Sequence, residues 1–449
     1  MKAGDTEGTN KVSQGTIIDK VDTNTIITNQ KTDTASSNTV TIETNDKNDK
    51  VEVTLKDVNI DTSNRNNAAV SVTGSGNTTI KLDGDNALKS DTYRSGIAST
   101  GSLTISGGEN DSLTAQGGSG ANGISSSGSL TISGGTVTAT GGNSTGIVGY
   151  GGSGIYSSSG VAISGGAVTA NGGDSKDGYG GNGIYSSSVA ISGGTVKAAG
   201  GNGKDGYGGN GISSTSTTIS GGTVTANGGS GNSSGGNGIR SNGVAISGGT
   251  VEAAGGVGKN GSGGSGIYSS GIDLSGSLEL TAKAGSPNGK ALSQKGSELV
   301  LDTIKDKLGP GAKVTATDAD GKVIDQVSTP RPVEPEESSS SSDGGSATPS
   351  APASPLPGLT VTDKSGAVIS YTSTQSGNTL TVCVGRFTAS LRASLSALRQ
   401  LRAEGIETIT FQTILCSTTL SVDELLAMGG EDAEAVLTHR LTDSSLTVG

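Results

Sequence analysis

The amino-acid sequence predicts an all-β fold, a right-handed parallel β-helix solenoid of about 28 residues per coil, and two periodic patterns support this prediction. The tetrapeptide Ile-Ser-Gly-Gly occurs six times at spacings of 27 to 31 residues, and the dipeptide Gly-Ile keeps the same period. A fixed period of this size, in strand-forming residues broken by glycine, is typical of a solenoid. The isoleucines concerned are Ile105, Ile132, Ile163, Ile191, Ile219 and Ile246 in the first pattern, and Ile97, Ile124, Ile155, Ile184, Ile212, Ile239 and Ile267 in the second.

Within one repeat, apolar residues alternate with small polar residues in three short runs, which is the pattern of strands with one buried face. Copies stacked at the strand spacing of a sheet, about 4.8 Å, would align these positions in internal columns. One coil buries too few side chains to offset its chain entropy, so neighbouring coils must stabilise each other. The right-handed sense follows the usual rule for parallel crossovers. The alternating positions of one repeat are Ile184, Val189, Ile191, Val196 and Ala198.

Composition limits the class of protein and its partners. With 78 glycines and 2% aromatic residues, a single globular core is not expected, and the strict period argues against disorder. The net charge is −11, and no basic patch interleaves with aromatic residues, so nucleic acid is not an expected partner. The sequence contains no run of 18 apolar residues, so it does not predict a membrane-spanning helix.

The compartment is inferred indirectly. The first ten residues lack the apolar run of a signal peptide, and we interpret this start as that of a mature or recombinant form. A surface rich in Ser, Thr, Gly and Asn favours an extracellular or cell-surface location. The two cysteines, Cys383 and Cys416, would either pair or remain two buried thiols, and they do not decide the compartment.

Composition changes divide the chain into four segments. Residues 1–50 are expected to form an N-terminal cap and first strands, 51–328 the β-helix, 329–358 a disordered linker, and 359–449 a small α+β domain. The linker holds seven of the nine prolines together with glutamates and a serine run. The segments SLELTA, ELVLDTI and AKVTATDADGKVID are predicted to continue the strands of the β-helix to about Val327.

The last segment combines strand and helix patterns. A helix is predicted from about Thr388 to Ala403, stopping at Gly405, and a second short helix is predicted at the capping box from Ser421 to Glu424. Strands precede and follow both helices. The apolar stripe assigned to the first helix is Leu391, Leu395, Leu398 and Leu401.

From Val51 onward the chain resembles a family of bacterial surface proteins with a carbohydrate-binding β-helix domain. The segments that carry the resemblance are VEVTLKDVNID, AAVSVTGSGNTTIKLDGDNAL, SGIASTGSLTISGG and NGISSSGSLTISGGTVTATGG, and it covers roughly residues 50 to 290. Characterised members are right-handed β-helices similar to pectate lyases. The resemblance implies calcium in the fold and binding of plant-cell-wall polysaccharide, acidic pectic chains included, without established catalysis.

Tyrosines interrupt the Ser- and Gly-rich repeats in two rows. Seven of the eight tyrosines lie between residues 93 and 268 of a chain with no Trp and two Phe. Rings one coil apart would form an amphipathic strip suited to sugar stacking, or they would instead cover loop backbone and pack on one another. The candidate carbohydrate-binding residues are Tyr156, Tyr185 and Tyr268, which directly follow Gly-Ile, Arg240 in the same row, and Tyr150, Tyr179 and Tyr207 in the loops.

Two loops nearly repeat each other, DSKDGYGGNG from Asp174 and NGKDGYGGNG from Asn202. They set Asp177 and Asp205, and likewise Lys176 and Lys204, 28 residues apart. Two carboxylates and two ammonium groups are therefore expected one coil apart, where they would hold calcium or an acidic sugar. Asp-Gly is also an ordinary turn dipeptide, so a solvated loop is the alternative.

A further row precedes Gly-Ile in four coils and consists of asparagines. An asparagine row inside a β-helix predicts a structural ladder whose amides bond along the stack. Its members are Asn122, Asn182, Asn210 and Asn237.

Signatures of an enzyme are thin. A polysaccharide lyase on this fold would need clustered carboxylates beside a Lys or Arg base, whereas the acidic residues of the repeats are scattered. The one histidine, His439, lies far from the repeats. We therefore expect a non-catalytic, secreted or cell-surface protein that binds polysaccharide. The alternative is a structural stalk or adhesin that presents the C-terminal domain or binds a protein partner on a host or cell-wall surface.

Overall fold

The chain is represented by a computed structural model that divides it into two compact units, Met1–Glu336 and Glu337–Gly449. The first is a parallel β-solenoid of about 12 coils with about 28 residues per coil, which confirms the predicted fold class. Except for its first two residues and its last, the expected linker 329–358 lies outside the described residues. The structure describes residues 1–5, 9–14, 16–29, 34–144, 149–330, 358–363, 367–369, 371–376, 378–384, 388–413, 417–428, 433–440 and 443–448.

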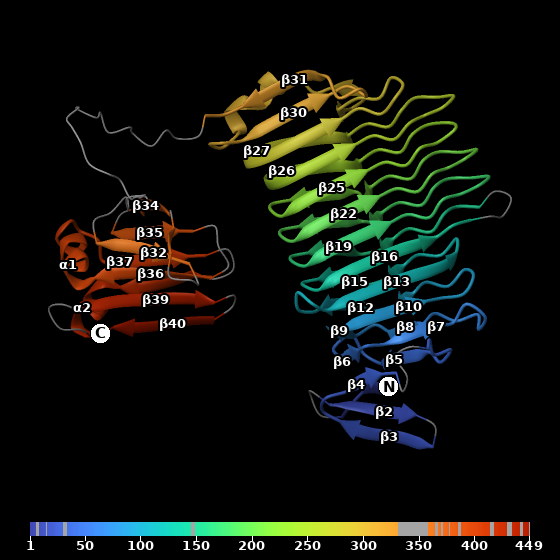
Figure 1. Cartoon of the computed structure of the whole chain (residues 1–449), viewed down its shortest axis with the longest axis horizontal. Helices are drawn as coiled ribbons and strands as arrows, with labels where there is room; N and C mark the ends of the chain where they lie inside the picture. Colours follow the sequence, from blue (N-terminus) through green and yellow to red (C-terminus); the bar gives the residue numbers. More distant parts are fainter. Residues whose placement is uncertain are drawn as a thin grey trace, which may run out of the picture. The chain divides into compact units, whose positions relative to one another are not determined.

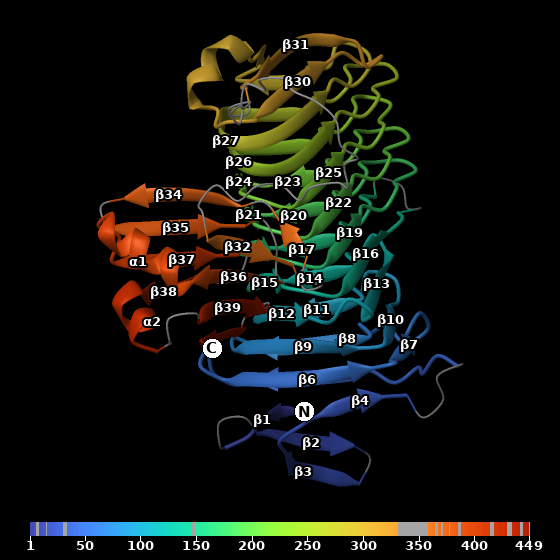
Figure 2. The same cartoon turned by 60° about the vertical axis from the view of Figure 1, so that its left-hand side comes forward.

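Each regular coil contributes one strand to each of three parallel ladders, which Figures 1 and 2 show stacked along the solenoid. The first ladder holds β8 (Val70–Gly74) and the Gly-Ile strands β11 (Ile97–Ser99), β14 (Ile124–Ser126), β17 (Ile155–Ser157), β20 (Ile184–Ser186) and β23 (Ile212–Ser213). The second holds β9 (Asn77–Asp83), β12 (Ser102–Ser106), β15 (Ser129–Ile132), β18 (Gly160–Ile163), β21 (Ser188–Ile191) and β24 (Ser216–Ile219). The third holds β10 (Asp85–Lys89), β13 (Ser112–Ser119), β16 (Thr136–Gly142), β19 (Ala167–Asn171), β22 (Thr195–Ala199) and β25 (Thr223–Asn227). Beyond them β26 (Ile239–Ala254) continues all three ladders and pairs along its length with β27 (Ile267–Lys283).

The register of the ladders explains the two sequence periods. Ile155 pairs with Ile184, and Ile163 pairs with Ile191, so that identical residues stack in buried columns. In five of the six copies of the Ile-Ser-Gly-Gly motif, the second glycine turns the chain toward the third ladder with a positive φ, 77° at Gly194. A side chain is strained in that conformation, so the motif requires glycine at this position.

Between the third ladder and the next Gly-Ile strand, each coil extends a glycine-rich loop, visible at the edge of the solenoid in Figure 1. Two backbone segments of each loop pack against each other at its base. The N–H of Gly209 donates to the carbonyl of Gly201, and the N–H of Gly229 donates to the carbonyl of Gly209, both at 2.8 Å. The same pattern joins successive loops into a hydrogen-bonded line along the stack. A Cβ added at Gly209 would lie 1.8 Å from the carbonyl oxygen of Gly181, so this glycine neck has no room for side chains.

Both ends of the solenoid depart from the repeat. At the start, the hairpin of β2 (Asn10–Gln14) and β3 (Ile17–Asp22) pairs with β1 (Lys2–Ala3), which in turn joins β5 (Val40–Thr44). At the other end, antiparallel β31 (Val323–Ser328) covers the edge of β30 (Lys313–Thr317), which removes an open sheet edge. The remaining end strands are β4 (Ile26–Thr28), β6 (Lys50–Lys56), β7 (Asn59–Asp61), β28 (Leu292–Gln294) and β29 (Ser297–Glu298).

The prediction of a strand across ELVLDTI is wrong. Only its first residue belongs to β29, and Leu301–Lys307 forms a 3₁₀ helix. Leu301 and Ile304 are both buried, and residues three apart lie on one side of a helix with three residues per turn. The alternating apolar residues therefore fill the end of the core by a helical turn.

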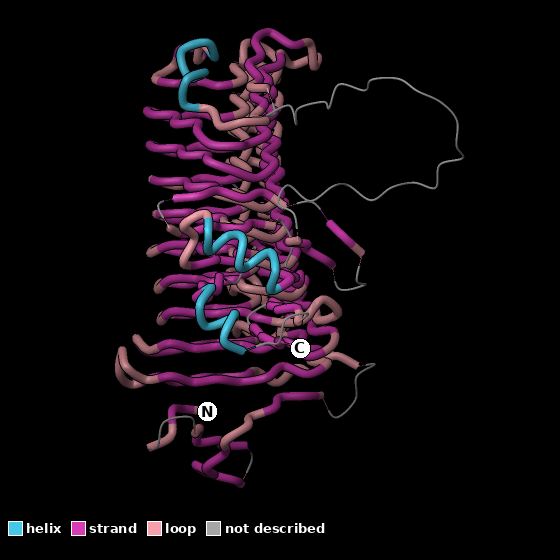
Figure 3. The backbone as a smooth tube through the Cα atoms, turned by 90° about the vertical axis from the view of Figure 1, so that its left-hand side faces the viewer, coloured by secondary structure: helices cyan, strands magenta, loops and turns pink. Residues whose placement is uncertain are grey.

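The described residues of the second unit form an antiparallel sheet, a mixed sheet and two short helices. Figure 3 shows strands predominating in the described chain. The five-stranded sheet consists of β33 (Val368–Ile369), β32 (Leu359–Thr362), β36 (Thr388–Ser394), β39 (Glu434–Arg440) and β40 (Asp443–Val448). The four-stranded sheet consists of β34 (Thr372–Ser376), β35 (Thr379–Cys383), β37 (Thr408–Gln412) and β38 (Ser417–Ser421). The helices are α1 (Leu395–Ala403) and α2 (Val422–Met428).

The predicted helix from Thr388 to Ala403 is wrong in its first half, which is the strand β36 between β32 and β39. Residues 388–394 alternate between half-buried and buried, a strand pattern, and Leu391 belongs to this strand. The side chain of Ser394 then accepts a hydrogen bond from the N–H of Ala397 at 3.2 Å and begins the helix. The predicted cap of α2 is confirmed, since Ser421 accepts from the N–H of Glu424 at 3.4 Å. Cys416 lies outside the described residues.

His439 links the two sheets of this unit from a fully buried position on β39. Its Nε2 lies 3.0 Å from the hydroxyl of Thr418, its Nδ1 lies 3.3 Å from that of Thr413, and its ring packs on Phe411. Burial lowers the pKa of His439 from its ordinary value of 6.5, because desolvation disfavours the charged imidazolium.

We expect the second unit to lose stability as the pH falls below 6.5, the ordinary pKa of histidine. Because the folded-state pKa is lowered, the unfolded chain takes up the proton first, so the contribution of neutral His439 is present above pH 6.5 and lost as pH falls through the folded pKa. Hydrogen exchange of residues 359–449 at pH 7.5 and 5, measured in the full chain, checks this. In the variant His439→Gln, hydrogen exchange should change less between the two pH values than in the wild type. An equal change in both proteins would contradict the role assigned to His439.

Candidate functional site

Four of the candidate residues lie in one outward row on the first ladder, as the period predicts. Tyr156 pairs in register with Tyr185, and Arg240 pairs with Tyr268 two coils further along. Ser213 occupies the coil between these two pairs. The positions face away from the core because each follows a buried isoleucine of a strand.

The tyrosines of this strand row leave part of their rings available to a ligand. The rings of Tyr156 and Tyr185 have centroids 5.6 Å apart and are tilted by 54°, so they are not stacked face to face. Tyr156 is half-buried. Tyr185 and Tyr268 are 46% and 42% exposed. An exposed aromatic face with a hydroxyl at its edge can pack against the C–H face of a sugar.

The loop tyrosines form a different arrangement. Tyr150, Tyr179 and Tyr207 stack with centroids 5.0 Å apart and interplanar angles of 13° and 3°. Each inner ring face is therefore turned to a neighbouring ring, and the row presents mainly ring edges and hydroxyl groups to the solvent. The alternative that tyrosines pack on their neighbours describes this loop row better than the strand row.

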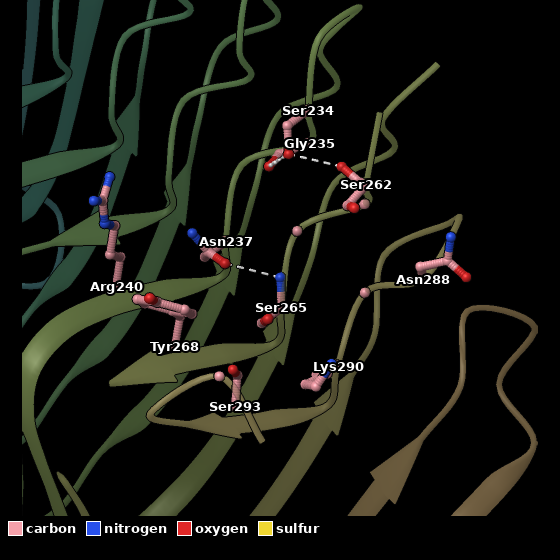
Figure 4. A pocket seen from close by; sticks show the side chains of 14 residues that line it. Ser234, Gly235, Asn237, Arg240, Ser262, Ser265, Tyr268, Asn288, Lys290 and Ser293 are labelled. Carbon is pink, nitrogen blue, oxygen red and sulfur yellow. Dashed lines mark hydrogen bonds between the residues drawn. The ribbon is translucent and has the colours of Figure 1, made fainter. Parts of the chain in front are cut away.

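Three adjoining hollows lie along these rows. A hollow of about 680 Å³ is lined by Tyr156, Tyr185, Arg240 and Tyr268 together with serines, and a second of about 580 Å³ lies along the loop tyrosines. A third of about 310 Å³ adjoins both at the C-terminal end of the rows, and Figure 4 shows the side chains that line it. Arg240 lines all three hollows, which together make a groove along the solenoid. We call this surface the tyrosine groove.

The predicted asparagine ladder lies along the second of these hollows. The Nδ2 of Asn210 donates to the Oδ1 of Asn182, and the Nδ2 of Asn237 donates to the Oδ1 of Asn210, both at 3.0 Å. The backbone N–H groups of Asn210 and Asn237 donate to the same two oxygens at 2.9 Å. The structural ladder is thus confirmed for Asn182, Asn210 and Asn237, whereas the Oδ1 of Asn122 accepts from the backbone N–H of Ser153 at 2.8 Å.

The electrostatics of the tyrosine groove are one-sided. No Asp or Glu lies among the described residues that line its three hollows. Arg240 is exposed and Lys290 is half-buried, and neither forms an ion pair with another described residue. In Figure 4, Tyr268 lies between these two cations. A groove with two unpaired cations and no described carboxylate suits anionic or neutral polar ligands.

Sequence reasoning missed Lys290 because its coil lacks the Gly-Ile marker. Ile267 pairs in register with Leu292, so Ala291 and Leu292 take the places of Gly and Ile. Lys290 then occupies the asparagine row, and its carbonyl accepts from the N–H of Gly266 as that of Ser265 does from Gly238. Aligning Ala-Leu as a variant of Gly-Ile would have found it.

The calcium prediction depends on Asp177 and Asp205, which a bridge between Ser175 and Gly203 brings to neighbouring coils. Asp177 is half-buried and Asp205 is exposed. Calcium takes six to eight oxygen ligands. No group of three or more acidic, His or Cys side chains able to hold a metal occurs among the described residues. Two carboxylates do not by themselves fit calcium, and the site stays a prediction.

Comparison of the chain with family models, curated proteins and solved structures found no match. Within the described part of the chain, each helix is too short or too polar to cross a bilayer. The protein is thus a parallel β-solenoid followed by a separate, β-rich C-terminal unit.

Proposed function

We propose that the solenoid is a non-catalytic, extracellular or cell-surface module that binds a linear polysaccharide in the tyrosine groove. The observation that carries this proposal is the meeting of the exposed rings of Tyr185 and Tyr268 with two unpaired cations in adjoining hollows. Serines and asparagines between them offer hydrogen bonds to sugar hydroxyls. Aromatic faces with a few placed polar groups are the usual composition of such sites.

The chemistry of the groove favours cell-wall polysaccharide, with acidic pectic chains included. A guanidinium such as that of Arg240 pairs with a carboxylate through two parallel hydrogen bonds, and Lys290 acts as a second point charge. Glycoside hydrolysis uses two carboxyl groups beside the scissile bond. None lines the described groove, so binding without cleavage is the activity that its residues support.

The repeat of the solenoid gives the proposed ligand a direction. Equivalent positions recur at each coil, and the strand spacing of a sheet is about 4.8 Å. A polymer lying along the groove would meet the same row at every coil, whereas a single sugar would meet one or two positions. Retention is therefore expected to rise with chain length, as for other multivalent contacts.

The double variant Tyr156→Ser with Tyr185→Ser is expected to bind polysaccharide more weakly while its melting temperature stays nearly unchanged. The strand row already carries Ser125 and Ser213 in neighbouring coils, so serine fits this row without disturbing the core. Affinity electrophoresis of the full chain in gels that contain pectic and other cell-wall polysaccharides measures retention.

The matched control is Tyr93→Ser, because Tyr93 is 78% exposed and lies outside the lining of the three hollows. It should retain binding. If the double variant and the wild type are retained equally, the strand row is not part of the binding site.

The alternative is a stalk or adhesin that presents the C-terminal unit or binds a protein partner. The division of the chain into a solenoid and a separate compact unit favours this candidate. Absence of retention for the wild type across a broad panel of polysaccharides would favour it over polysaccharide binding.

A further inference from the structure

We propose that the loop stack of Tyr150, Tyr179 and Tyr207 is a site of oxidative cross-linking, at which a peroxidase and hydrogen peroxide join neighbouring coils through dityrosine. This proposal does not depend on polysaccharide binding. It rests on the geometry of the three rings, on their exposure and on the absence of cysteine from the solenoid sequence.

The phenol rings of the stack are nearly parallel and are repeated from one coil to the next. Gly151 N–H donates to the carbonyl of Tyr179, and Gly180 N–H donates to that of Tyr207, so the backbone repeats from one loop to the next. The ring planes of Tyr179 and Tyr207 differ by only 3°, with centroids 5.0 Å apart. Each ring is therefore close to a copy of its neighbour moved by one coil, and equivalent ring carbons face each other across one coil step.

The three side chains are accessible to an oxidant. Tyr150, Tyr179 and Tyr207 are 61%, 42% and 46% exposed and extend from loops rather than from strands. The strand pair Tyr156 and Tyr185 is tilted by 54°, which is a less suitable alignment.

The coupling step balances without any group from the protein besides the two phenols. Each phenol loses one electron and one proton to give a phenoxyl radical. The two radicals form one C–C bond between the ring carbons ortho to the hydroxyls, and each ring then moves its ortho hydrogen to the phenol oxygen to regain aromaticity. The two electrons and two protons reduce one hydrogen peroxide to two waters on the peroxidase haem.

A cross-link at this place would join coils of the solenoid covalently. Both cysteines lie after residue 380, so no disulfide can join coils of the solenoid. A dityrosine between adjacent loops would connect two coils covalently and oppose their local separation. Such a link limits the open conformations in the manner of a disulfide across a loop.

The test treats the dilute full chain with a haem peroxidase and hydrogen peroxide, then digests it with trypsin. Tyr207 is the only tyrosine of the tryptic peptide 205–240, and Tyr179 lies in the peptide 177–197. We expect these two peptides joined within one chain, with the mass lower by two hydrogen atoms, together with dityrosine fluorescence.

The variant Tyr179→Phe removes the central phenol and leaves Tyr150 and Tyr207 two coils apart, while its ring preserves the stack. We expect loss of the joined peptide in this variant and its retention in the control Tyr185→Phe. Joined peptides at the wild-type level in Tyr179→Phe, or loss in Tyr185→Phe, would overturn the proposal. So would cross-links that form only between two chains, which electrophoresis under denaturing conditions separates from those within one chain.

Discussion

Ile191→Asp is expected to lower the stability of the solenoid by at least about 4 kcal/mol and to open more than one coil. Ile191 is 1% exposed and lies in register between Ile163 and Ile219. A carboxylate at this place would face isoleucines above and below, with no hydrogen-bond partner. Because each coil is stabilised by its neighbours, the loss extends to the coils on both sides.

Thermal melting and limited proteolysis measure this effect. The matched control is Ala190→Asp, which adds the same charge at the adjacent, exposed position of the same strand. The control should leave the melting temperature nearly unchanged. If Ile191→Asp also melts like the wild type, with no new cleavage sites between residues 150 and 230, the column assignment is wrong.

The regular coils could be predicted from the sequence because each rests on a repeated local pattern. The alternation of apolar and polar residues predicted that Ile191 and Val196 are buried, and they are. The period predicted that Tyr156 and Tyr185 are neighbours, because parallel strands in register bring equivalent residues of successive repeats together.

Where the repeat ends, local patterns were misleading. The alternation across residues 299–304 predicted a strand, but residues 301–307 form a 3₁₀ helix. The leucine stripe that begins at Leu391 predicted a helix, but residues 388–394 alternate as a strand.

The candidate site could be predicted only in part. The period identified which tyrosines share a row, but the orientation of the rings depends on side-chain torsions and on the loop backbone. The structure therefore separates the stacked rings of Tyr179 and Tyr207 from the tilted rings of Tyr156 and Tyr185, which the sequence treats alike. Lys290 stayed hidden because its coil departs from the Gly-Ile marker.

The close packing of the glycine neck could not be predicted from the sequence, because glycine-rich loops by themselves suggest only flexibility. In the structure, Gly181, Gly201 and Gly209 form a line of backbone hydrogen bonds of 2.8 Å. Their lack of side chains lets two backbone segments approach closely in each loop. The abundance of glycine is thus a packing requirement at these positions.

Gly209→Ala is expected to destabilise the loop stack by about 3 kcal/mol and to disorder the loop tyrosines. The new methyl group would lie 1.8 Å from the carbonyl oxygen of Gly181, which is backbone and cannot rotate away. The loop must therefore separate from the preceding loop, and the hydrogen bonds of Gly209 to its neighbours are lost. Thermal melting and proteolysis within residues 200–211 report the change.

The matched control is Gly271→Ala, because a Cβ at Gly271 meets no atom within 4 Å. Alanine at a compatible strand position restricts the unfolded chain, so the control should leave stability unchanged or raise it by up to about 1 kcal/mol. Hydrogen exchange distinguishes the two substitutions further. Gly209→Ala should expose the amides of Gly209 and Gly229, whereas Gly271→Ala should leave them protected. Equal protection of these amides in both variants would show that the neck is not closely packed, and the packing role assigned to its glycines would then be wrong.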